Sequence, residues 1–129
     1  MKARRKWCFG IGVCLALLFS SAANAQSAGE MLRACEALEQ GMRVVGEHPY
    51  LPRRPDVQQC WGFMEAVQQY ATLAGQDGKQ LLNACPGPDT KTTDIVGVFI
   101  KYARARPEKL ELKAAAVAYN AMADAFPCK

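Results

Sequence analysis

Cysteine offers the most chemistry in this chain of 129 residues, which contains six of them. Two, Cys8 and Cys14, lie in an apolar segment near the N-terminus. The other four are separated by 25, 25 and 43 residues: Cys35, Cys60, Cys85 and Cys128. A structural zinc site usually brings its cysteines in close pairs, so this wide spacing argues against a metal. An even number of separated cysteines in a small exported domain is typical of disulfides, and we expect two.

Export is predicted by the first 25 residues. Four basic residues precede an apolar run at positions 7–19, and Ala-Asn-Ala at 23–25 supplies the small-x-small pattern of a cleavage site. The run is too short to cross a bilayer as a helix, which needs about 20 residues. We therefore predict a signal peptide over residues 1–25 and one mature domain over residues 26–129, with no membrane association after cleavage.

The charge of the chain changes when this segment is removed. The sequence holds 16 Lys and Arg against 12 Asp and Glu, a net charge of +4. Four of the basic residues lie in the predicted signal peptide, which leaves twelve of each sign in the mature chain. Binding to nucleic acid depends on clustered excess Lys and Arg, so a neutral chain argues against that class of function.

Catalytic chemistry is not indicated by the remaining residues. His48 is the single histidine, and with every mature cysteine oxidised it has no thiol to activate. Glu65 and Asp124 have no identifiable partner for acid–base work. The Gly75–Gly78 segment lacks the Lys-Ser or Lys-Thr of a phosphate-binding loop. We therefore expect no enzyme, no cofactor and no metal.

Four helices must position these residues, because apolar side chains recur at helical spacing between segments rich in Gly and Pro. They are expected from residue 27 to 41 or 46, and over about 56–75, 92–106 and 111–125. The first begins with a capping box between Ser27 and Glu30. Gly62, within the second, predicts close packing against another helix. Without strand-like alternation of useful length, the predicted fold is all-α, with two antiparallel helical hairpins packed together.

This arrangement selects one of the three possible disulfide pairings. Cys85 precedes the third helix and Cys128 follows the fourth, so in an antiparallel hairpin they lie at the same end. Cys35 and Cys60 lie nearly level in the first hairpin, as judged from their distances to the bend. We therefore predict the pairs Cys35–Cys60 and Cys85–Cys128.

Basic residues gather between positions 101 and 113. They are Lys101, Arg104, Arg106, Lys109 and Lys113. A solvated helix face is the ordinary explanation for such a cluster. The alternative is a surface that docks on an acidic patch of a partner. The aromatic residues also exceed what one apolar stripe per helix requires, so some of them are expected at a subunit interface.

Several motifs together resemble those of one family. They are the order of the four cysteines, Cys60-Trp61-Gly62-Phe63, Val98-Phe99-Ile100-Lys101-Tyr102 followed by Arg106-Pro107-Glu108, and the terminal Ala125-Phe126-Pro127-Cys128. In these respects, the mature chain from Ser27 to Lys129 resembles the type VI secretion amidase immunity family, the Tai and related Rap immunity proteins.

The resemblance implies a helical, disulfide-bonded periplasmic homodimer that binds and inhibits a secreted peptidoglycan amidase effector and so protects the producing cell. A protruding loop would occlude the catalytic cleft of the effector. We expect that role in the segments 85–92, braced by prolines, and 104–113, which carries charge. The candidate partner-binding residues are Pro86, Pro88, Asp89, Arg104, Arg106, Glu108 and Lys109.

A second hypothesis is a general periplasmic stress or chaperone-like helical dimer without a dedicated toxin partner. Protonation of all carboxylates and His48 would bring the neutral mature chain to about +13, and self-repulsion would then open a dimer.

Overall fold

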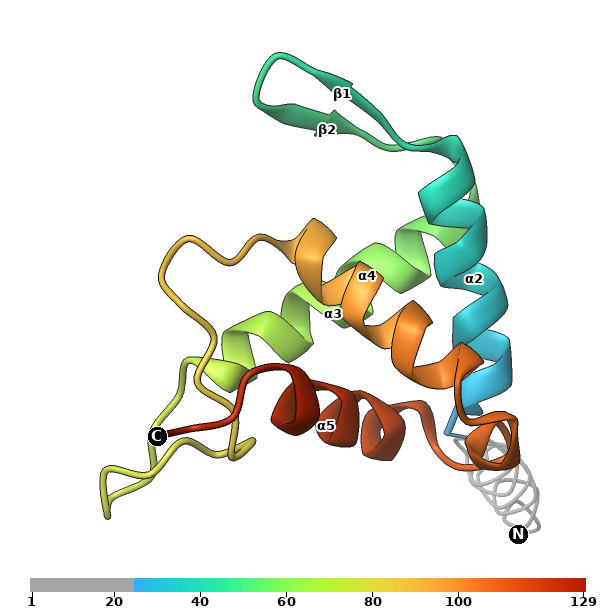
Figure 1. Cartoon of the computed structure of the whole chain (residues 1–129). Coiled ribbons are helices and arrows are strands. Elements are labelled where there is room, and N and C mark those ends of the chain that lie inside the picture. Colours follow the sequence, from blue (N-terminus) through green and yellow to red (C-terminus); the bar gives the residue numbers. More distant parts are fainter. Residues whose placement is uncertain (1–24) are drawn as a thin grey trace, which may run out of the picture.

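The computed structural model describes residues 25–129 (Figure 1). Residues 1–24, nearly all of the predicted signal peptide, lie outside the described residues. The elements in chain order are α2 (Ala28–Gly41), β1 (Arg43–Val45), β2 (His48–Tyr50), α3 (Pro55–Ala71), α4 (Thr92–Arg104), the 3-10 turn η2 (Pro107–Lys109) and α5 (Ala114–Ala125). Within the described part, no helix is both long enough and apolar enough to span a membrane.

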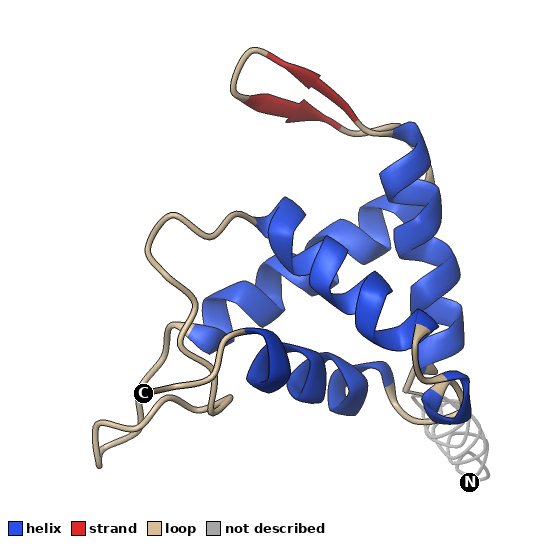
Figure 2. Ribbon diagram, viewed as in Figure 1, coloured by secondary structure: helices blue, strands red, loops and turns tan. Residues whose placement is uncertain are grey.

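The fold is mostly helical but not strictly all-α. The four expected helices are present among residues 25–129, and the consecutive pairs α2–α3 and α4–α5 pack together. Residues 43–45, which lie between the two expected stops of the first helix, and residues 48–50, expected in a loop rich in Gly and Pro, instead form the antiparallel hairpin β1–β2, drawn in red in Figure 2. The prediction that strands are lacking was therefore wrong.

The capping box that begins α2 is confirmed. The Ser27 hydroxyl accepts a hydrogen bond from the Glu30 amide at 3.2 Å, and the Glu30 carboxylate accepts one from the Ser27 amide at 2.9 Å. The helix ends at Gly41, the earlier of the two expected stops. A Cβ atom on Gly41 would lie only 2.8 Å from Cγ of Pro52, so glycine allows the proline segment to pack against the end of α2.

The expectation that Gly62 in α3 allows close packing against another helix was wrong. Gly62 is exposed, and a Cβ atom there would meet nothing within 4 Å, so it does not serve close packing between helices. The buried stripe of α3 consists of Val57, Cys60, Met64, Val67 and Ala71. Gly62 follows Cys60 by two residues, about 200° around the helix, and therefore lies on the opposite side.

The last two helices differ from expectation only at their ends. α4 begins at Thr92 as expected but ends at Arg104, two residues early, and Pro107 begins the separate turn η2. α5 starts at Ala114 rather than near Glu111, because the preceding residues are held against the start of α2. The Ala28 amide donates to the Leu112 carbonyl at 2.7 Å, and the Ala114 amide donates to the Gln26 carbonyl at 2.9 Å.

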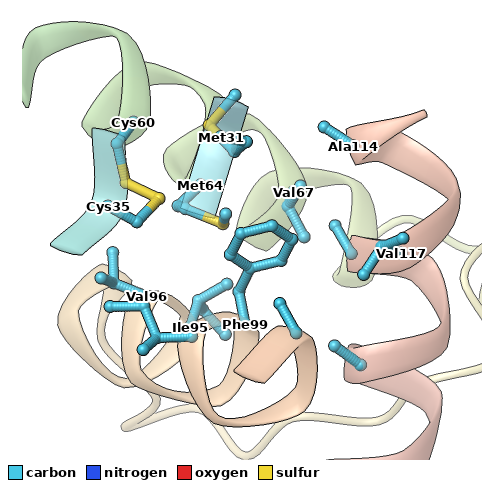
Figure 3. Packing of buried hydrophobic residues seen from close by; sticks show 14 of the residues in the cluster. Met31, Cys35, Cys60, Met64, Val67, Ile95, Val96, Phe99, Ala114 and Val117 are labelled. Atoms are coloured by element: carbon cyan, nitrogen blue, oxygen red, sulfur yellow. A yellow bond between two sulfur atoms is a disulfide. The ribbon is translucent and has the colours of Figure 1, made fainter. Parts of the chain in front are cut away.

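One apolar core lies among the four helices. Figure 3 shows Phe99 of α4 pointing toward Met64 and Val67 of α3. Cys35 and Cys60 form a disulfide inside this core, with their Cα atoms 5.1 Å apart. Cys85 and Cys128 form the second disulfide, with their Cα atoms 5.0 Å apart. Both predicted pairings are therefore confirmed.

Candidate functional site

The predicted partner-binding residues lie at the two ends of α4. Pro86, Pro88 and Asp89 are in the segment that leads into the helix, whereas Arg104 is its last residue. Arg106, Glu108 and Lys109 follow in and beside η2. Thirteen helical residues span about 20 Å, so the two groups do not form one continuous cluster.

Arg104, at the C-terminal end of α4, is engaged within the molecule. Its Nε atom donates to Oε1 of Glu36 in α2 at 2.8 Å, and its Nη2 atom lies 3.9 Å from Oε2 of Glu39. Such exposed pairs stabilise a fold by about 0–1 kcal/mol. The contacts join α4 to α2 and leave less uncompensated charge for a partner.

Tyr102 engages two further basic residues. The Arg106 guanidinium lies 3.8 Å from the centre of the Tyr102 ring, a cation–π contact. Lys109 donates from Nζ to the Tyr102 hydroxyl at 2.9 Å. Glu108 is exposed, and no described ion pair includes it. Most of the predicted basic cluster thus holds the C-terminal end of α4 in place.

A groove lies at the other end of α4, where the hairpin, α3 and the segment before α4 meet. It has a volume of about 560 Å³. Its lining residues are Val44, Glu47 and Pro49 of the hairpin, Trp61 and Gln68 of α3, and residues 88–93. Two predicted residues, Pro88 and Asp89, belong to this groove, and Pro86 precedes it in the same segment.

Gln68 fixes the wall of the groove that residues 88–93 form. Its Nε2 atom donates to the Thr90 carbonyl at 2.6 Å, and its Oε1 atom accepts from the Thr92 hydroxyl at 2.5 Å. The Thr90 amide also donates to the Gly87 carbonyl at 3.0 Å, which closes a turn. One half-buried side chain of α3 therefore holds both sides of the junction with α4.

The hairpin forms the opposite wall, and sequence reasoning missed it. Gly46 begins its two-residue turn with φ of +66°, a conformation that favours glycine. Val44 pairs with Pro49, and Val45 pairs with His48. By the alternation of an antiparallel ladder, Val44–Pro49 is a non-hydrogen-bonded pair, so the missing proline N–H costs no ladder bond. The available signal was two β-branched residues before a turn glycine.

The comparison with known protein families agrees with the motifs in the sequence. A model of the Rap1a immunity proteins matches residues 27–128, which is nearly all of the described chain. This chain belongs to the Rap1a immunity protein family. The match confirms the resemblance to Rap and Tai-type immunity proteins, and it supports a role as an immunity protein that binds a secreted type VI effector. No curated protein and no solved structure matches the chain.

Charged residues surround the groove of this Rap1a family member. Glu47 and Asp89 lie in its facing walls, and neither takes part in an ion pair within residues 25–129. Glu65 is exposed on the same helical face of α3 as Trp61 and Gln68, since residues three and four apart are neighbours. Among the described residues that line the groove, Lys91 is the one basic residue.

The other residues considered for metal binding or catalysis do not lie together in this family member. Within residues 25–129, no group of three or more His, Cys, Asp and Glu residues is arranged to hold a metal ion. His48 is exposed in β2, and Asp124, near the end of α5, lies 3.5 Å from Arg106. The groove beside the hairpin, by contrast, brings residues from three parts of the described chain together around one open space.

Proposed function

We propose that this Rap1a family member is a periplasmic immunity protein that binds and inhibits a peptidoglycan amidase delivered by type VI secretion. The family match over residues 27–128 carries the immunity role. The proposal that the target is an amidase rests on two motifs of this chain that resemble those of the amidase immunity family: Cys60-Trp61-Gly62-Phe63 and Phe126-Pro127-Cys128. Inhibition is steric: the protein covers the cleft of the effector and performs no chemistry itself.

The fixed geometry of the surface supports tight binding by such an inhibitor. The Cys85–Cys128 disulfide anchors the segment that begins at Cys85, and Gln68 holds it again at Thr90 and Thr92. A surface ordered before it meets its partner loses little entropy on binding. The inhibitory contact is accordingly assigned to the hairpin and to residues 86–93.

Export to the periplasm is part of the proposal. Gln26, the first residue after the predicted cleavage site, already belongs to the folded domain: its carbonyl accepts from the Ala114 amide at 2.9 Å, and its side chain accepts from Gln59 at 2.7 Å. Cleavage before Gln26 would therefore leave these contacts intact. The intact mass of protein from a periplasmic extract is expected to correspond to residues 26–129 with two disulfides.

Two copies are proposed to associate as the active form. Large apolar side chains outside both the groove and the hairpin remain exposed and supply candidates for this contact: Tyr70, Leu73, Leu81, Leu112 and Tyr119. Exposed aromatic and aliphatic side chains of this kind are typical of interface cores. Light scattering of the purified protein measures the number of copies directly.

The deciding experiment combines the periplasmic protein with the purified peptidoglycan amidase encoded beside it. The expected result is a stable complex in which hydrolysis of peptidoglycan stops. Cells that lack this chain are expected to lyse when sibling cells deliver the amidase. Absence of a complex, together with unchanged resistance of the deletion strain, would contradict the proposed function.

A further inference from the structure

We propose that the groove between the β1–β2 hairpin and residues 88–93 receives an extended segment of the effector that carries Lys or Arg beside an apolar side chain. The inference rests on the proposed function, because the occupant is the effector itself. It adds the chemistry of the effector segment that the hairpin and residues 88–93 would bind.

The groove has the size and the walls of a binding site. Its volume of about 560 Å³ lies within the range of about 300–1,000 Å³ in which proteins hold ligands. Val44 and Pro49 face it from the hairpin, and Trp61 faces it from α3. The contacts of Gln68 fix the third side, so the groove exists before a partner arrives.

The hairpin leaves apolar surface open to water on both of its faces. Directly opposed residues share a face and successive residues alternate, so Val44 and Pro49 face the groove while Val45, His48 and Tyr50 face away. The exposed fractions are 66% for Val44 and 70% for Val45. A two-stranded hairpin alone is only marginally stable in water. A partner strand or loop seated in the groove would cover the Val44 face and stabilise the hairpin.

The charges select a cationic occupant. Glu47 and Asp89 line the groove against Lys91, and Glu65 lies beside it on the face of α3 that carries Trp61 and Gln68. None of these four forms an ion pair within residues 25–129. Complementary charge steers association and fixes register. The basic residues near η2 lie about 20 Å away along α4, which is more than two Debye lengths of about 8 Å at physiological salt. They would not repel a cationic segment in the groove.

The same charges disfavour a second copy of this chain as the occupant. In a two-fold symmetric contact, each patch faces its own copy. The groove carboxylates of Glu47 and Asp89 would then approach those of the second copy, and like charges brought together oppose association. The effector therefore fits the groove better than self-association does.

The first test compares Val44→Asn with Val45→Asn. These neighbouring valines are almost equally exposed, but only Val44 lines the groove, so Val45→Asn is a matched control for folding and for the loss of a methyl pair. Binding is measured by titration calorimetry against the neighbouring amidase, inactivated at its nucleophile. Val44→Asn is expected to weaken binding about tenfold, whereas Val45→Asn leaves it within about twofold.

The second test uses charge. Glu47→Lys is expected to weaken binding about tenfold, and added salt is expected to weaken binding of the wild-type chain. Glu111→Lys makes the same change at an exposed carboxylate outside the groove and is expected to have little effect. An equal loss in both variants would overturn the inference, because the effect would then reflect net charge alone.

Two further outcomes separate the hypotheses. If the wild-type chain binds the amidase but Val44→Asn and Glu47→Lys bind equally well, the groove is not the site, and the immunity function stands. If the wild-type chain does not bind the amidase, both proposals fail. Light scattering tests the remaining possibility, that a second copy of this chain occupies the groove. A wild-type dimer that Val44→Asn converts to a monomer would show this and overturn the inference.

Discussion

Gly62 lies within α3, is exposed, and has open space where a Cβ atom would stand. Glycine in a helix interior lowers stability relative to alanine by about 0.5–1 kcal/mol, because the unfolded chain gains conformational freedom. We predict that Gly62→Ala raises the free energy of unfolding by about that amount, as measured by urea denaturation. Gly41→Ala is the contrasting control and should lower it, since the new Cβ atom would lie 2.8 Å from Cγ of Pro52. A Gly62→Ala variant no more stable than wild type would contradict the prediction.

Glu30 makes the start of α2 sensitive to pH. Hydrogen bonds from the backbone amide and then the side chain of Ser27 hold the pKa of the Glu30 carboxyl below its ordinary value of 4.5. A carboxyl with a lowered folded-state pKa stabilises the fold fully above its unfolded pKa, and this contribution disappears as pH falls through the folded value. Glutamine mimics the protonated carboxyl. We therefore predict that Glu30→Gln is less stable than wild type at about pH 7 and that the difference vanishes at about pH 2.

Urea titrations at several pH values measure this difference. Glu111→Gln removes an exposed carboxylate that is outside any helix cap and should show no such pH-dependent difference. A gap between Glu30→Gln and wild type that stays constant down to the acid limit would show that the charge of Glu30 is not responsible.

At the scale of elements, the structure could be predicted from the sequence wherever the interactions that control it are local. The capping box of Ser27 and Glu30 fixes the start of α2, and the wide cysteine spacing with antiparallel helix pairs fixes both disulfides. The hairpin was not predicted because its strands are three residues long, too short to show alternation, and because Pro49 and its neighbouring prolines indicate a loop. Its register depends on one turn glycine, Gly46.

The groove could not be predicted from local sequence patterns, for a different reason. Pro88 and Asp89 were predicted from the proline content of their own segment, but Val44 and Trp61 reach the same groove from elements far apart in sequence. Only the packing of α3 against α2 and α4 brings these residues together. Likewise, the basic residues 104–109 formed a cluster in sequence, whereas the structure directs Arg104 to α2 and Arg106 to Tyr102.

The connection between α3 and the segment before α4 depends on Gln68. Gln68→Leu keeps a side chain of similar size but leaves the Thr90 carbonyl and the Thr92 hydroxyl without their partner. We predict faster amide hydrogen exchange in residues 87–92, with unchanged exchange in α2, and weaker binding of the effector because the loop must be ordered on binding. Gln69→Leu is the matched control, since Gln69 is exposed and makes no described side-chain hydrogen bond. Equal exchange in both variants would show that Gln68 does not hold the loop.

At the scale of the whole molecule, the two disulfides stabilise different parts of the fold. Cys35 and Cys60 are fully buried and join α2 to α3 within the core. Cys85 and Cys128 are exposed and join the segment before the groove to the end of the chain, where the Cys85 amide also donates to the Phe126 carbonyl at 2.7 Å. The first link therefore belongs to the core, and the second positions the surface proposed to bind the effector.

This division predicts the order of reduction. Thiol–disulfide exchange requires a thiolate to reach a sulfur atom, so mild dithiothreitol should open Cys85–Cys128 while the native core still shields Cys35–Cys60. Peptide mapping after alkylation should then find label on Cys85 and Cys128 alone. Helical circular dichroism should persist, and binding of the effector should weaken because the loop has lost its anchor. A Cys85→Ser, Cys128→Ser double variant should match the partly reduced protein. Early label on Cys35 or Cys60 would instead mean that the core opens before the surface link breaks.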